Sequence, residues 1–280
     1  EYSCQCDKES PHILGEISLL MSGLEALKAN SKGLFSLDDK VAGTIPHWNS
    51  GKWKANIEVQ DLLRLTSGIK SHKKPGHGHP SYHKALKMPA IYPPGDIFRF
   101  GPTSYQAFGG FMAEKTGRGN ILKEQILRPL GIPGARWLTV GNVPSGIAKY
   151  KTQELSPRRF DGAHLEPSEL GRIGLMLING GKWQGSTIIN NTQPLTRGSE
   201  ACPVFGLGVW LNKQVSAAKL VSISQKIPES LNIDPGRQKL IYDNAPEDLF
   251  MAAGRFNQRL YIIPSQIGRA SCRERVFPVV

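Results

Sequence analysis

The stretch IEVQDLLRLTSGI, residues 57–69, decides the fold of this chain of 280 residues. Its apolar residues Val59, Leu62 and Leu63 recur at helical spacing and would lie on one face of a helix. Gly68 follows five residues after the last of them, and glycine is the residue that most easily ends a helix. The stretch therefore predicts a helix that stops at Gly68 and leads into a long loop.

Four other blocks accompany this stretch along the chain. They are GLFSLDDKV (33–41), FRFGPTSYQAFGGFMAEKTG (98–117), ILRPLGI (126–132) and MAAGRFNQRLYIIPS (251–265). Together with the first stretch they resemble, in the same order, blocks of the serine β-lactamase-related family. That family includes class C β-lactamases, penicillin-binding D-Ala-D-Ala peptidases and family VIII esterases. The resemblance implies a largely antiparallel sheet flanked by helices, an inserted helical subdomain, and acyl transfer through a serine.

Hydrophobic periodicity indicates the same α+β class. Helical patterns cover residues 17–33, 103–117, 120–131 and 167–181. Short β-branched and aromatic runs follow, as expected for antiparallel strands: FGLGVWLN (205–212), QKLIYDN (238–244), DLFMAAG (248–254) and QRLYIIP (258–264). Because helices come first and strands last, we expect an α+β layer arrangement. The expected parts are an irregular or foreign N-terminus (1–15), one serine-hydrolase-like domain (16–265) with a helical subdomain (57–190) and strands (203–265), and a tail (266–280).

The resemblance also implies three catalytic motifs, and this chain departs from all of them. The family's Ser-x-x-Lys opens a helix, its Tyr-x-Asn shuttles a proton, and its Lys/His-x-Gly lies beside the oxyanion. Counting back from GLFSLDD without gaps places Glu16 at the serine and Leu19 at the lysine. The tyrosine position falls on Phe100, whose ring cannot accept a proton, and the third motif retains only Gly254.

A cleft between the helical subdomain and the strand at 249–254 is implied by the same resemblance. The residues expected to line it are Phe100, Gly101, Pro102, Ala252, Ala253, Gly254 and Gln258. No catalytic residue is identifiable, so we expect a homologue of a serine acyl-transfer hydrolase that is inert as written, with hydrocarbon where relatives carry ionisable groups. The alternative is a protein of the same fold that binds peptides or cell-wall fragments without turning them over. The implied ligands are small esters, lactams or peptides, and no cofactor is implied.

Two nearby hydroxyl groups could replace the missing base and nucleophile. Tyr105 is the nearest phenol, but it shares its helical face with Phe108 and Met112, which favours core packing over a role as base. Ser18 would be a displaced nucleophile if the count were off by two. Its third neighbour is Met21 rather than lysine, so we expect an ordinary surface serine on a helix.

Charge, histidines and cysteines add little to this assignment. The formal net charge is +12, but the basic residues are scattered, so a solvated basic surface is favoured over nucleic-acid binding. Four histidines (His72, His77, His79 and His83) lie in a Gly/Pro-rich loop without an acidic ligand beside them, so we expect no catalytic metal. The four cysteines contain no CxxC pair and leave the compartment open.

The two ends of the chain look unlike the family. No run of 18 apolar residues and no signal-peptide pattern is present, so we expect no membrane span, although the family is commonly periplasmic or secreted. Too few residues precede the first helix to supply the family's edge strands, which predicts an incomplete sheet. Residues 267–276 resemble a translated sequencing adapter, with a natural basic tail as the alternative.

Overall fold

A computed structural model describes residues 11–71, 79–117, 120–140, 156–224, 238–255, 258–266 and 270–274 of the chain. Its main sheet is antiparallel and four-stranded, with the order β11-β10-β9-β8. The strands are β8 (Trp210–Leu211), β9 (Phe250–Ala253), β10 (Gln258–Ile262) and β11 (Ala270–Glu274). In the register, Leu260 lies opposite both Ala252 and Cys272.

Short strands form smaller sheets. The order in the three-stranded sheet is β1-β5-β2, and β3 pairs with β4 and β6 with β7. Their bounds are β1 (His12–Ile13), β2 (Arg136–Trp137), β3 (Thr139–Val140), β4 (Ser156–Pro157), β5 (Ala163–Leu165), β6 (Lys182–Trp183) and β7 (Ser186–Thr187). Since β1 precedes the first helix, the residues just before that helix do pair, although their sequence shows no alternation.

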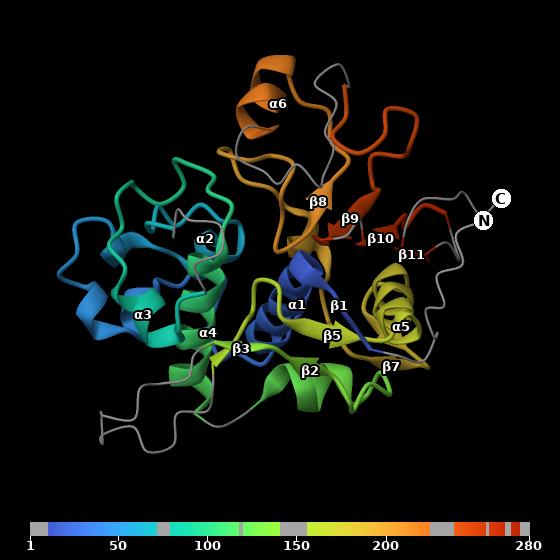
Figure 1. Ribbon diagram of the computed structural model, residues 1–280, viewed down its shortest axis with the longest axis horizontal. Coiled ribbons are helices and arrows are strands. Elements are labelled where there is room, and N and C mark those ends of the chain that lie inside the picture. Colours follow the sequence, from blue (N-terminus) through green and yellow to red (C-terminus); the bar gives the residue numbers. More distant parts are fainter. Residues whose placement is uncertain are drawn as a thin grey trace.

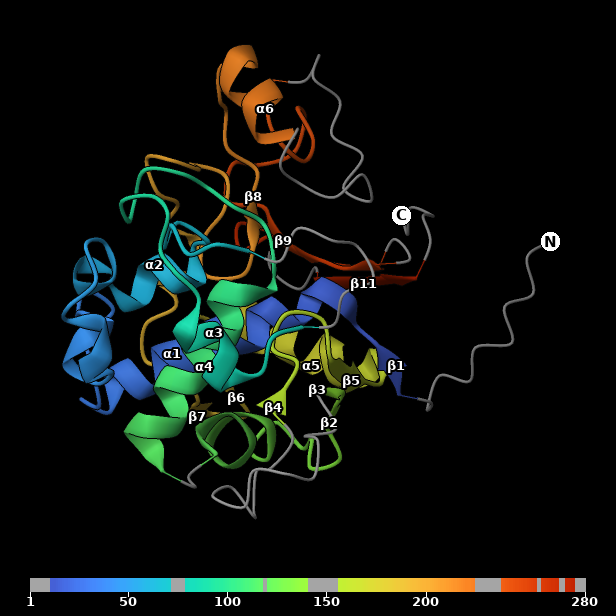
Figure 2. The same cartoon turned by 60° about the vertical axis from the view of Figure 1, so that its left-hand side comes forward.

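Helices form the rest of the body. The α-helices are α1 (Ser18–Ser31), α2 (Val59–Leu63), α3 (Tyr82–Lys87), α4 (Pro102–Thr116), α5 (Pro167–Ile178) and α6 (Ala217–Ser224). Shorter turns are η1 (Gly15–Ile17), η2 (Val41–Gly43), η3 (Pro46–Trp48), η4 (Lys54–Asn56), the π-type η5 (Lys123–Leu127) and η7 (Gln193–Thr196). Helices α2, α3 and α4 form a layer on one side of α1, and the main sheet lies on the other (Figure 1). The turned view in Figure 2 shows the same order of layers.

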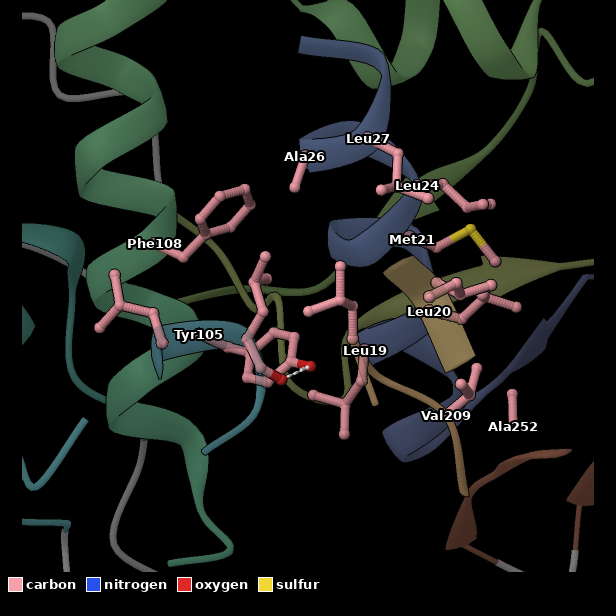
Figure 3. Close-up of a cluster of buried hydrophobic side chains, with 14 of the residues drawn as sticks. Leu19, Leu20, Met21, Leu24, Ala26, Leu27, Tyr105, Phe108, Val209 and Ala252 are labelled. Carbon is pink, nitrogen blue, oxygen red and sulfur yellow. Dashed lines mark hydrogen bonds between the residues drawn. The ribbon is translucent and has the colours of Figure 1, made fainter. Parts of the chain in front are cut away.

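Helix α1 is the centre of the core. Tyr105 and Phe108 of α4 pack toward one side of it, and Val209 and Ala252 lie on its sheet side (Figure 3). Almost every position of α1 is buried, so it is not the one-sided amphipathic helix that its apolar spacing predicts. The reason is that two layers enclose it, and a helix enclosed in this way is buried all round.

Helix α3 packs closely on α4 through two glycines. A Cβ on Gly109 would lie 2.4 Å from the Tyr82 ring, and one on Gly110 would lie 2.8 Å from the Leu86 side chain. The two glycines therefore allow α3 to approach α4 closely. This approach explains why α4 keeps two residues that weaken a helix.

Three predicted elements differ in the structure. The helix of residues 57–69 ends at Leu63, because Leu65 turns to a φ of 61° and the Thr66 amide bonds back to the Asp61 carbonyl. Helix α4 starts at Pro102, with Gly101 as its N-cap, one residue before the predicted start at residue 103. The run 238–244 forms no extended strand, only an isolated bridge from Lys239 to Gln214.

Part of the predicted C-terminal tail belongs to the main sheet. Residues 270–274 pair along the whole of β10 as β11, so part of the predicted separate tail extends the main sheet. In the described residues, no helix combines the length and the apolar character that crossing a bilayer would require.

Candidate functional site

The start of α1 meets the end of β9. A Cβ on Gly254 would lie 2.1 Å from the Leu14 carbonyl oxygen and 3.2 Å from the Glu16 amide nitrogen. Only a glycine fits this approach of two backbones. The fold thus brings together Glu16 and Gly254, which are more than two hundred residues apart and which the sequence analysis predicts to belong to two of the family's three motifs.

Glu16 does not face an empty pocket, because Arg255 pairs with it. The Arg255 Nε lies 3.2 Å from Glu16 Oε1, and its Nη2 lies 3.1 Å from Asp161 Oδ2. The Glu16 side chain is only 10% exposed, whereas that of Arg255 is 53% exposed. The second carboxylate oxygen of Glu16, Oε2, is buried and has no hydrogen-bond partner among the described residues.

Asp161 is the centre of this charged cluster. Its side chain is 1% exposed and accepts two hydrogen bonds from Arg158, of 2.9 Å from Nε and 2.7 Å from Nη2. The Nε2 atom of His79 lies 3.1 Å from the same carboxylate and 3.1 Å from Arg158 Nη2. Two carboxylates therefore balance two guanidinium groups, as buried charges require. We call Glu16, His79, Arg158, Asp161 and Arg255 the cleft ion cluster.

Phe100 belongs to an aromatic group beside this cluster. Its ring centroid lies 5.1 Å from that of Phe160 and 5.8 Å from that of Trp210, and it is half-buried. Phe205 stacks edge-on against Trp210 at 4.7 Å. The Phe160 ring centroid also lies 6.0 Å from that of His79, so the aromatic group and the ion cluster are neighbours.

The side chains of Leu19, Tyr105 and Ser18 are all buried in the core. Leu19 is buried in α1, and the Tyr105 hydroxyl donates to the Leu63 carbonyl at 2.7 Å. Burial raises the pKa of Tyr105 well above its ordinary value, which makes it a poor base and agrees with the predicted core packing. Ser18 is fully buried rather than on the surface: its Oγ donates to the Gly15 carbonyl and accepts from the Ala163 amide.

The other residues expected to line a cleft have structural roles in the strands and at the start of α4. The side chain of Gln258 donates to the Ile13 carbonyl at 2.7 Å, which ties β10 to β1. Ala252 and Ala253 are buried strand residues of β9. Pro102 is the first residue of α4, and a Cβ on Gly101 would lie 2.3 Å from the Ser71 hydroxyl.

Two further buried hydroxyls lie near the start of α4. Ser67 and Ser104 place their Oγ atoms 2.8 Å apart, so these two side chains bond to each other.

Of the four loop histidines, His72 and His77 lie outside the described residues. In the part of the chain that the structure does describe, no three His, Cys, Asp or Glu side chains gather as metal ligands would.

Sequence reasoning missed the cleft ion cluster. The expectation of hydrocarbon at this position is wrong beside Glu16, although Phe100 and Leu19 agree with it. Arg158, Asp161 and Arg255 stand outside the family motifs and follow no recognisable spacing, so only the unusual run RRFDG (158–162) hinted at a charge centre.

A family model and several solved structures are similar to this chain. The sequence model of the β-lactamase family matches residues 19–259 of the chain. No curated protein sequence is significantly similar to it.

Solved structures share the fold at low sequence identity. A putative β-lactamase from Bacteroides dorei has a TM-score of 0.68 and 15% identity, over 96% of this chain and 80% of that one. A penicillin-binding protein homologue from Caulobacter crescentus has a TM-score of 0.63 and 15% identity, over 92% and 76%. EstCE1, a hydrolase with promiscuous acyltransferase activity, has a TM-score of 0.63 and 15% identity, over 92% and 78%.

The match of the family model extends over most of the chain, and the fold shared with these structures is an α+β arrangement of helices and antiparallel sheet. We conclude that this chain belongs to the β-lactamase family.

Proposed function

We propose that this member of a family of serine hydrolases no longer performs acyl transfer. The observation that carries the proposal is the Glu16 carboxylate at the start of α1, held by Arg255 beside Gly254. A carboxylate paired with a guanidinium is a weak nucleophile, and it repels the anion that forms during acyl transfer. Leu19 and Phe100, in the other two positions, offer neither a base nor a proton donor.

The expected loss of turnover is large. Removal of the nucleophile alone costs serine enzymes on the order of 10⁶ in turnover. Here three positions are changed at once, and groups that act as a unit do not add their effects. We therefore expect turnover no faster than that of an unrelated protein.

The test is covalent labelling of the purified chain. A fluorescent penicillin and p-nitrophenyl butyrate serve as probes, and intact-mass spectrometry detects any acyl adduct. We expect neither an adduct nor ester turnover above a buffer control, while an active penicillin-binding protein labels under the same conditions. A stoichiometric serine adduct that no longer forms after heat denaturation of the chain would overturn the proposal.

A second candidate function is binding of peptides or cell-wall fragments without turnover. Arg255 favours it, because its half-exposed guanidinium pairs with Asp161, which directly follows Phe160 of the aromatic group, and a cation near aromatic rings suits a ligand with one carboxylate and one apolar group. Titration of D-Ala-D-Ala, followed by calorimetry, tests it. We expect the variant Arg255→Ala to weaken binding at least tenfold, and an unchanged affinity would exclude this ligand class at this position.

A further inference from the structure

A second polar site lies in a pocket that opens to solvent between α1, α4 and the segment that follows α4. It is a pocket of about 200 Å³. Apolar side chains from each element form its walls, among them Met21 of α1, Met112 of α4, and Leu122 and Leu127 of the following segment. We call it the α1–α4 pocket. It lies away from the cleft ion cluster: Ser22 and Glu25 are six and nine residues after Glu16, which places them about 9 and 14 Å further along the helix axis.

The floor of this pocket carries an ion pair. The Arg159 Nη1 donates to Glu25 Oε2, and its Nε donates to the Tyr82 hydroxyl at 2.9 Å. The Arg159 side chain is 14% exposed and that of Glu25 is 4% exposed. Burial opposes the Arg159 charge, but the Glu25 carboxylate outweighs it, so the pKa of Arg159 is raised. The charges of the floor are balanced within the protein.

Backbone and side-chain contacts hold this floor in place. The Arg159 amide donates to the Gln106 side chain at 2.8 Å, and the Arg159 guanidinium lies 5.5 Å from the centre of the Phe108 ring. Gly109 leaves the space that Tyr82 and Arg159 occupy, because a Cβ there would lie 2.7 Å from Arg159 Nε. The polar groups of the pocket are therefore fixed before any ligand arrives, which lowers the entropic cost of binding.

Ser22 supplies a hydroxyl that the protein does not use. It lines the pocket and its residue is 1% exposed. Among the described residues, no group forms a hydrogen bond with its Oγ. A hydroxyl that lines a pocket and has no partner within the protein can bond to a ligand there in place of water.

The volume and the charge balance together define a ligand class. A cavity of about 150 Å³ lined by apolar side chains is large enough for benzene. The larger α1–α4 pocket, with a polar floor, suits a ring that carries one small polar substituent. A charged ligand would lack a buried counter-ion, since Glu25 and Arg159 already neutralise each other and the lysine of the lining, Lys123, is exposed to solvent that screens its charge. We propose that the α1–α4 pocket binds a neutral monocyclic molecule whose amide or hydroxyl group bonds to Ser22 and to the Glu25–Arg159 pair.

Methionine methyl groups provide the direct test. The chain has five methionines, of which Met21 and Met112 line the pocket, whereas Met88, Met176 and Met251 do not. We expect benzamide to shift the ¹³C-methyl NMR signals of the first two in a saturable way, with a dissociation constant of roughly 1 mM, as befits a ligand of this size. Benzoate and toluene should each bind at least tenfold more weakly. The carboxylate of benzoate would have no buried counter-ion, and toluene has no polar group that could bond to the floor.

Two variants and one control complete the experiment. Ala135→Phe, at the rim of the pocket, should abolish the benzamide shifts, and Ser22→Ala should weaken benzamide about fivefold while leaving toluene unchanged. Thr196→Phe places the same ring in a different pocket, between α5, η7 and β8–β9, and should leave the benzamide shifts intact. The Met176 and Met251 signals report whether each variant is folded. The proposal is overturned if Met21 and Met112 do not respond to benzamide, if all five methionines respond alike, or if folded Ala135→Phe protein binds like the wild type.

Discussion

Lys54 places an ammonium group beneath the helical layer. Its Nζ donates to the Leu86 carbonyl at 2.6 Å and lies 4.9 Å from the centre of the Trp48 ring. Burial lowers the pKa of Lys54 to about 8. The same carbonyl also accepts a hydrogen bond of 2.9 Å from Trp48 Nε1, so it keeps a partner when the lysine is replaced.

The pH dependence of stability follows from this lowered pKa. Between pH 8 and about 10.5 the unfolded chain holds a proton that folded Lys54 has released, so the free energy of unfolding rises with pH. The slope for one proton is at most about 1.4 kcal/mol per pH unit, and screening by solvent reduces it. We expect the free energy of unfolding of Lys54→Met to exceed that of the wild type by most below pH 8. This difference should shrink as the pH approaches 10.5. Urea unfolding at several pH values measures this, with Lys52→Met, an exposed neighbour, as the control; a constant difference would contradict the prediction.

At the same scale, the prediction of which residues stand at the motif positions rests on the sequence alone. Counting along the chain places Glu16, Leu19 and Phe100 there, because the spacing within each block is local. The partners of Glu16 cannot be identified in this way. Arg255 and Asp161 come from distant segments, and a salt bridge between such segments exists only when the fold brings them together.

Among the elements, helix α4 shows how packing overrides helix propensity. Alanine usually stabilises an exposed helix by about 1 kcal/mol relative to glycine. At Gly109 the added Cβ would lie 2.4 Å from the Tyr82 ring, and the displaced ring also bonds to Arg159. We therefore expect Gly109→Ala to lower the free energy of unfolding by about 1–3 kcal/mol, as overpacking does.

Helix α5 supplies the matched control for this substitution. A Cβ on Gly171 would meet no atom within 4 Å, so Gly171→Ala should stabilise the protein by about 0.5–1 kcal/mol. Guanidinium chloride unfolding of both variants measures the two changes. Changes of the same sign would show that propensity, rather than the contact with Tyr82, decides the outcome.

Element bounds were predictable where a local signal exists. The ends of α1 and α5 agree with the glycines that follow them, Gly33 and Gly180, which adopt φ values of 71° and 62°. The early end of α2 was not predictable, because it depends on Leu65 adopting a φ that non-glycine residues seldom take. Its neighbour Thr66 holds that turn through bonds to Asp61.

For the molecule as a whole, α1 makes the helical layer and the sheet one cooperative unit. Leu24 is fully buried in α1, between the two layers. Leu24→Ala should cost about 2–5 kcal/mol, and amide hydrogen exchange in α4 and in β9–β10 should accelerate together. Leu175→Ala, at a 40% exposed position of α5, should cost less than about 0.5 kcal/mol. Faster exchange in one layer alone would contradict the idea of a single unit.

The sequence by itself determined the family and the α+β class, and it predicts the loss of the three motif residues. Those properties depend on residue types at short, fixed spacings, which can be recognised in the sequence without knowing which distant segments are in contact. Only the tertiary structure decided that Glu16 is neutralised by Arg255, that Ser18 is buried, and that Glu25, Tyr82 and Arg159 form the floor of a pocket. Each of these depends on segments far apart in the chain, whose contacts are set by how the layers close around α1.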